Sequence, residues 1–126
     1  MRLLNKEELI LLHTLMSEKL GTSEGLRDEG LLESALYSVG QSFGGVELYP
    51  SPVEKCARLA YNLITNHAFI DGNKRIGVLC MLVLLELNGI RHSLTNEDVI
   101  SIGMGVARGE MEYSDILLIL KEKCEK

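Results

Sequence analysis

Residues 67–87 read His67-Ala68-Phe69-Ile70-Asp71-Gly72-Asn73-Lys74-Arg75, followed by IGVLCMLVLLEL over positions 76–87. The first nine residues combine a histidine, a carboxylate, a glycine, an amide and two cations, and the apolar run follows without a break. This order predicts a polar loop that leads into a helix over residues 73–87, which Asn88-Gly89 ends. Because apolar residues surround the expected helix on all sides, we predict that it is central and buried.

Helical periodicity continues on both sides of this segment, and it is marked by capping residues. Further helices are expected at both ends of the chain, and their capping or first residues are Asn5, Leu31, Ser51, Thr95 and Ser114. Residues 41–50, with Gly44-Gly45 in the middle, form the longest loop and are a candidate flap over a site. We find no strand alternation, no repeat and no linker. The prediction is therefore one all-α domain over residues 1–126, with about six helices around the central one.

Composition excludes several classes of function. The net charge of −5 argues against a broad nucleic-acid surface, which needs a basic patch. The three cysteines form no CxxC pair, so neither a zinc site nor a disulfide framework is indicated, and Cys56 and Cys80 are expected in the core. The uncharged apolar run over residues 76–85 is shorter than the roughly 20 residues that span a bilayer. We expect a soluble cytoplasmic protein.

Two side chains of the polar loop suit proton transfer and metal binding. His67 can accept a proton near neutral pH and is a candidate general base. Taken alone, a histidine here more often caps the end of the preceding helix. Asp71 is a candidate ligand for Mg²⁺ on a phosphate; the alternatives are a turn with Gly72 or a helix cap. Phe69 is expected in the core, where it would pin the loop.

The following residues suit an anion. Gly72 allows a positive φ and a close approach to the backbone, and Asn73 either orders the loop or caps the helix. Lys74 and Arg75 lie in the first helical turn, where cations oppose the helix dipole. A phosphate between them and the free N–H groups would resolve this mismatch, although two solvated cations are the alternative. Together, the loop fits phosphoryl or nucleotidyl transfer, in which catalysis is mostly positioning and charge neutralisation.

The motif resembles that of the Fic/Doc superfamily, and specifically that of the Doc (death-on-curing) toxins. The family pattern is His-x-Phe-x-(Asp/Asn)-(Gly/Ala)-Asn-Lys-Arg, which residues 67–75 match at every defined position. Other stretches with Doc-like sequence occur along the chain at 25–28, 43–45, 47–50 and 87–89. The resemblance implies an all-α Fic fold with ATP and Mg²⁺ as cofactors. In that fold His67 deprotonates a target hydroxyl, Asp71 positions Mg²⁺ or a phosphate, and residues 72–75 form the anion site.

The chain departs from the AMP-transferring Fic pattern, Gly-Asn-Gly-Arg-x-x-Arg. Lys74 replaces its second glycine and Val78 replaces its second arginine. The resemblance therefore favours the Doc reaction, in which a reversed ATP gives its γ-phosphate to a threonine of elongation factor Tu and translation stops. The alternatives are a protein adenylyltransferase and a non-catalytic binding module; the intact His67 argues against the second of these.

Family resemblance also concerns the partners. The inhibitory Fic segment, (Ser/Thr)-x-x-x-Glu-(Gly/Asn), is incomplete here, with near misses at 14–18 and 93–97. We therefore expect that a separate, Phd-like antitoxin restrains the protein, through a segment that folds as it docks. Direct contacts with nucleic acid or membrane are not expected.

Overall fold

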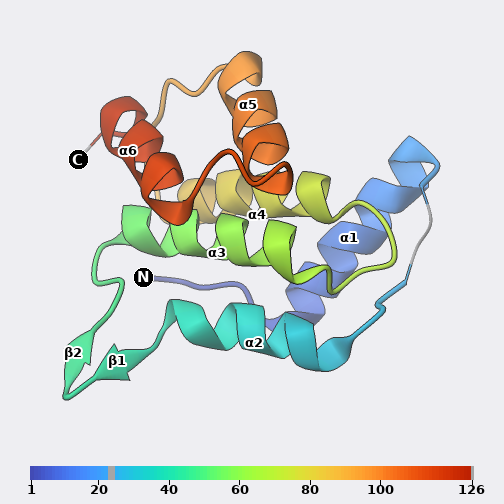
Figure 1. Cartoon of the computed structure of the whole chain (residues 1–126), viewed down its shortest axis with the longest axis horizontal. Coiled ribbons are helices and arrows are strands. Elements are labelled where there is room, and N and C mark those ends of the chain that lie inside the picture. Colours follow the sequence, from blue (N-terminus) through green and yellow to red (C-terminus); the bar gives the residue numbers. More distant parts are fainter. Residues whose placement is uncertain (23–24, 126) are drawn as a thin grey trace.

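The computed structural model describes residues 1–22 and 25–125 (Figure 1). These residues form six helices: α1 (Lys6–Leu20), α2 (Glu29–Val39), α3 (Pro52–Asn66), α4 (Asn73–Leu87), α5 (Asn96–Ala107) and α6 (Tyr113–Lys123). A small antiparallel hairpin of β1 (Ser42–Phe43) and β2 (Val46–Glu47) joins α2 to α3. The all-α prediction is confirmed. The hairpin was missed because strands of two residues carry no alternation that a sequence pattern can reveal.

Helices α3 and α4 form the centre of the molecule (Figure 1). Helix α3 packs on α4, α2, α6 and α5, whereas α4 packs on α3, α5 and α1. The chain runs from left to right through α3 in Figure 1, turns at the right-hand end, and returns through α4. The polar loop is this turn, so the two central helices fix both of its ends.

A glycine lets the two central helices approach closely. Gly77 of α4 faces α3, and a Cβ atom there would lie 2.6 Å from Ile64 Cγ1 and 3.1 Å from the Ala60 carbonyl oxygen. Ala60, Ile64 and Gly77 are all buried. The missing side chain at Gly77 therefore sets the spacing of α3 and α4, and with it the geometry of the loop between them.

The expected caps form at most helix ends. Asn5 begins α1 and Thr95 begins α5, each with a reciprocal capping box, and Ser51 caps α3 through its bond from the Glu54 N–H. Gly21 ends α1 in the left-handed conformation. These local signals explain why the predicted helices lie close to the observed ones.

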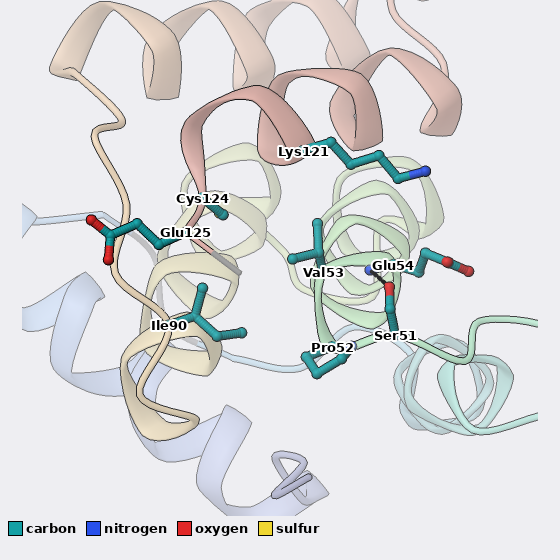
Figure 2. Close-up of a pocket in the computed structure, with 8 residues that line it drawn as sticks. All are labelled: Ser51, Pro52, Val53, Glu54, Ile90, Lys121, Cys124 and Glu125. Atoms are coloured by element: carbon teal, nitrogen blue, oxygen red, sulfur yellow. Dashed lines mark hydrogen bonds between the residues drawn. The ribbon is translucent and has the colours of Figure 1, made fainter.

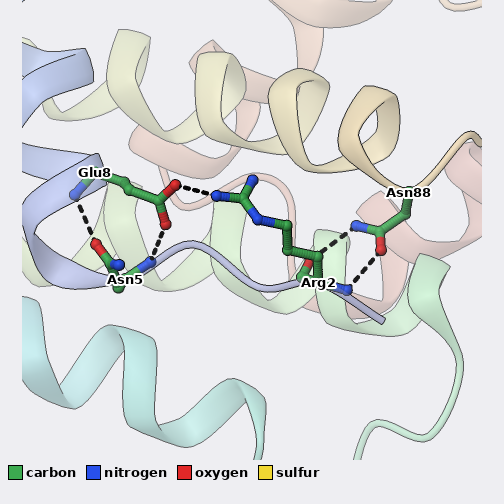
Figure 3. Close-up of polar contacts among 4 residues, drawn as sticks. All are labelled: Arg2, Asn5, Glu8 and Asn88. Atoms are coloured by element: carbon green, nitrogen blue, oxygen red, sulfur yellow. Dashed lines mark hydrogen bonds and ion pairs between the residues drawn. The ribbon is translucent and has the colours of Figure 1, made fainter.

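Paired hydrogen bonds attach the N-terminal segment to the end of α4 (Figure 3). The Arg2 N–H donates to Asn88 Oδ1 at 2.8 Å, and Asn88 Nδ2 donates to the Arg2 carbonyl at 2.9 Å. The Arg2 guanidinium also pairs with Glu8 of the α1 capping box. Asn88 thus ends α4 and fixes the chain that leads into α1.

The expectation of a buried central helix is confirmed, and the expectation of a flap needs correction. The apolar residues 76–85 of α4 are all buried or half-buried, and only the ends of the helix are exposed, where Leu87 is 42% exposed. The hairpin in residues 41–50 lies at the N-terminal end of α3, whereas the polar loop follows its C-terminal end (Figure 1). The hairpin is therefore not a flap over that loop. Cys56 and Cys80 are buried as expected, and burial raises the pKa of each thiol to about 12.

Candidate functional site

His67 lies at the C-terminal end of α3, where the polar loop begins. It is the C-cap residue of α3, and its backbone is left-handed with φ 53° and ψ 45°. Within the described residues it is the only non-glycine residue with a positive φ. Its side chain is exposed. His67 thus ends the helix through its backbone, while its imidazole stays accessible for chemistry.

Asn73 closes the loop on itself. Its Oδ1 accepts the Phe69 N–H at 3.0 Å, and its Nδ2 donates to the Phe69 carbonyl at 2.9 Å. Phe69 is 2% exposed and belongs to the core, as predicted. Of the two roles considered for Asn73, the structure shows loop ordering, because Gly72 is the N-cap residue of α4.

Asp71 and Gly72 form the tight turn that enters α4. Asp71 Oδ1 accepts the Gly72 N–H at 2.7 Å, so one carboxylate oxygen holds the turn and Oδ2 makes no hydrogen bond within the described residues. Gly72 has φ 76°, and a Cβ atom there would lie 2.8 Å from Met16 Cε. The left-handed conformation favours glycine at this position, whereas the flexible end of the Met16 side chain could move away from a Cβ atom. The Gly72 N–H, predicted to bind an anion, is instead occupied by Asp71 in this structure.

His13 of α1 packs against this turn and contacts its backbone. This residue was not identified from the sequence. The side chain is 1% exposed and its ring stacks on Phe69, with centroids 3.9 Å apart and an interplanar angle of 8°. His13 Nε2 lies 2.7 Å from the Asp71 carbonyl oxygen. The available signal was a polar residue between Leu9 and Met16 on the buried stripe of α1, which indicates a buried partner.

A second support, also missed, comes from the short segment before α2. The Arg27 and Asp28 N–H groups donate to the Ala68 carbonyl at 2.8 and 3.0 Å, and the Ile70 N–H donates to the Gly25 carbonyl at 3.1 Å. Residues 25–28 therefore lie antiparallel to the loop and hold its first half against the body of the protein.

The start of α4 suits an anion. Gly72 provides no side-chain cap, so the N–H groups of the first turn face outward without an intrahelical partner. Lys74 and Arg75 are exposed, and neither forms an ion pair with another described residue. Both side chains line a groove of about 290 Å³ between α4 and α5, together with Val78 and Gly103. The site therefore places two free cations at the positive end of a helix dipole.

Asp71 alone could hold only a cation whose other ligands come from a bound molecule or from water. Among the described residues, no three His, Cys, Asp or Glu side chains gather as they would around a protein-bound metal. Mg²⁺ commonly takes one carboxylate and completes its shell with phosphate oxygens and water. The unpaired Asp71 Oδ2 fits that arrangement, so ATP would have to bring most of the ligands.

A larger cavity, of about 600 Å³, lies at the opposite end of α3 (Figure 2). It is formed by the first turn of α3, by Ile90 and by the end of α6, including Lys121 and Cys124. It contains none of the motif residues. The polar loop therefore lies on an open surface, away from this cavity.

Comparison with known proteins shows the family of this chain. The model of the Fic/DOC family matches residues 3–85, which include α1–α3, the polar loop and most of α4. This chain belongs to the Fic/DOC family. The family match contains both supports of the loop, His13 and Arg27, as well as the motif itself.

Two curated relatives share the Doc name. The chain is 38% identical over 66 residues to "Toxin Doc" of Mycolicibacterium smegmatis, a match that covers 52% of this chain and 51% of that protein. It is 28% identical over 116 residues to "Protein kinase doc" of Escherichia phage P1, covering 92% of this chain and 90% of that protein. The resemblance to the Doc toxins is thus confirmed. In the described part of this Fic/DOC chain, no helix has the length and apolar character needed to cross a membrane.

Proposed function

We propose that this protein is a Doc-like toxin that transfers the γ-phosphate of ATP to a protein hydroxyl. One observation carries the proposal: a single loop joins an exposed histidine at the end of α3 to an uncapped helix start with two unpaired cations. The names of the two relatives, a toxin and a protein kinase, support it.

Each residue has a role in the proposed reaction. The N–H groups of the first turn of α4, together with Lys74 and Arg75, hold the phosphates, and Asp71 Oδ2 holds Mg²⁺. His67 takes the proton as the target hydroxyl oxygen bonds to the γ-phosphorus. The bond from that phosphorus to its bridging oxygen breaks, and ADP leaves. The protein contributes mainly position and positive charge, which is what phosphoryl transfer requires.

Lys74 stands where the AMP-transferring Fic pattern has a glycine, and this difference, together with Val78, supports γ-phosphate transfer. A Cβ atom at Gly103 would lie 3.0 Å from Lys74 Cγ, so the lysine side chain packs along α5 beside the helix start. Val78, one turn further on, offers no charge to orient an ATP whose α-phosphate faces His67. Adenylyl transfer remains the second candidate, because His67 and the helix start would serve either reaction.

The proposed target is a threonine of elongation factor Tu, whose modification would stop translation. The test is to incubate the two purified proteins with Mg²⁺ and ATP and to measure the intact mass of the elongation factor. We expect a gain of one phosphoryl group, which fragmentation places on a threonine. An unmodified elongation factor, alongside a different phosphorylated protein in cell extract, would show that the target is wrong although the transfer is right.

We also propose that an antitoxin in trans restrains the protein. His67, Ile70, Asp71, Lys74 and Arg75 are all exposed, so no described segment of the chain covers the site. The free chain should therefore arrest growth, and a co-expressed Phd-like antitoxin should relieve the arrest. A free chain that stays harmless until one of its own segments is removed would contradict this.

Replacing Asp71 with asparagine is expected to weaken Mg²⁺-dependent ATP binding and to leave the fold intact. Asparagine keeps the Oδ1 atom that accepts the Gly72 N–H, so the turn survives, while the charge that attracts Mg²⁺ is lost. We expect calorimetry to show an ATP affinity about 10-fold weaker with Mg²⁺, a change that corresponds to about 1.4 kcal/mol of binding free energy. The melting temperature should stay the same.

The control is the same titration without Mg²⁺, in which the two proteins should bind ATP with similar affinity. Equal affinities with Mg²⁺ present would exclude Asp71 as a metal ligand.

A further inference from the structure

We propose that Arg27 is a positioning residue for His67. The Arg27 side chain reaches across from the segment before α2 and donates two hydrogen bonds to the His67 carbonyl oxygen, one from Nε at 2.8 Å and one from Nη2. This contact fixes the peptide that follows His67 and thereby the direction of the imidazole. The inference rests on the proposed function, in which His67 accepts the proton.

The backbone at His67 adopts a conformation that such a contact helps to stabilise. A left-handed conformation places the Cβ atom close to the following carbonyl oxygen, so residues other than glycine adopt it reluctantly. His67 adopts it with φ 53°, at the end of a helix whose last carbonyl groups lack intrahelical donors. The planar guanidinium of Arg27 matches one carbonyl with two donors, which a lysine ammonium cannot do in the same fixed geometry.

An alternative role for Arg27 is simply to stabilise α3 as a cation at its C-terminal end. Other contacts hold the loop in place without the Arg27 side chain, so the two roles can be tested by removing it. The neighbouring Ala68 carbonyl is bound by the main-chain N–H groups of Arg27 and Asp28, and these bonds do not depend on the side chain at position 27. Arg27 and His67 are both exposed, so water can replace the guanidinium at the His67 carbonyl. Removing the side chain should therefore free the orientation of His67 without unfolding the loop.

Arg27→Ala is expected to lower kcat about 10²-fold, the size of effect that a misplacement of about 1 Å can cause. The KM for ATP should change little, since Lys74, Arg75 and the start of α4 are untouched. Arg27→Lys keeps the charge but loses the planar pair of donors that bind the His67 carbonyl. Its kcat should therefore lie between those of the wild type and the alanine variant. Arg108→Ala is the matched control, because Arg108 is also an exposed arginine at the C-terminal end of a helix, α5, far from the motif in sequence.

The decisive readout does not require activity. In ¹⁵N-labelled protein, the ring signals of His67 should shift or broaden in Arg27→Ala, whereas those of exposed His92 should not move, and Arg108→Ala should change neither. Unchanged His67 signals and an unchanged kcat, with only a lower melting temperature, would overturn the inference and leave Arg27 a helix cap. If the wild type transfers no phosphate but the His67 signals still respond to Arg27→Ala, the proposed function fails and the positioning role stands.

Discussion

Replacing His67 with alanine is expected to reduce phosphate transfer by about 10³-fold and to abolish growth arrest, because a positioned general base contributes roughly 10²–10⁴-fold to the rate. The side chain is exposed at the end of α3, and His67 does not belong to the core. The loop should keep its shape, since Arg27 donates to the carbonyl oxygen of residue 67, which alanine also has, and Asn73 binds the Phe69 backbone.

Steady-state transfer and helical circular dichroism, measured on the same preparation, check this result. His92→Ala is a suitable control, because His92 is exposed and lies between α4 and α5, outside the motif. Full growth arrest by His67→Ala at wild-type expression would show that His67 is not the base.

Replacing Gly77 with valine is expected to give the largest loss of stability. Even the Cβ atom would lie 2.6 Å from Ile64 Cγ1, and the two γ-carbons of valine would crowd the buried contact of α3 with α4 further. Overpacking of a close-packed core typically costs about 1–3 kcal/mol, and this position is near the upper end because the neighbours include backbone. The midpoint of thermal unfolding should fall by roughly 10 °C.

Gly40→Val provides the matched control. Gly40 ends α2 with φ −98°, and no atom lies within 4 Å of its ideal Cβ position, so valine should be accommodated there. Thermal unfolding of both variants, followed by circular dichroism, makes the comparison. Equal midpoints would mean that α3 and α4 can separate without loss, and that Gly77 does not set their spacing.

Local signals explain how much of this fold could be predicted from the sequence. The bounds of α4 match the predicted helix over residues 73–87, because the glycine before it and Asn88-Gly89 after it act within one turn of the helix ends. The capping boxes of α1 and α5 are local in the same way. The hairpin in residues 41–50 could not be placed, since its location depends on how α2 packs against α3.

The site was predictable only in part, for a similar reason. The motif residues are consecutive, so residues 67–75 could be recognised as one unit and His67, Asp71, Lys74 and Arg75 named within it. The supports of the loop come from distant parts of the chain: His13 lies 58 residues before its partner Asp71, and Arg27 lies 40 residues before His67. No periodicity or spacing rule links such pairs, and only the packing of α1 and the segment before α2 brings them together.

The most direct test of the account asks which phosphate of ATP reaches the target. The protein should be incubated with cell extract and ATP carrying a radioactive label at either the α or the γ position, with His67→Ala in parallel. We predict labelled protein with the γ label only, and none with His67→Ala. Protein labelled from the α position would mean AMP transfer and would contradict the proposed kinase reaction.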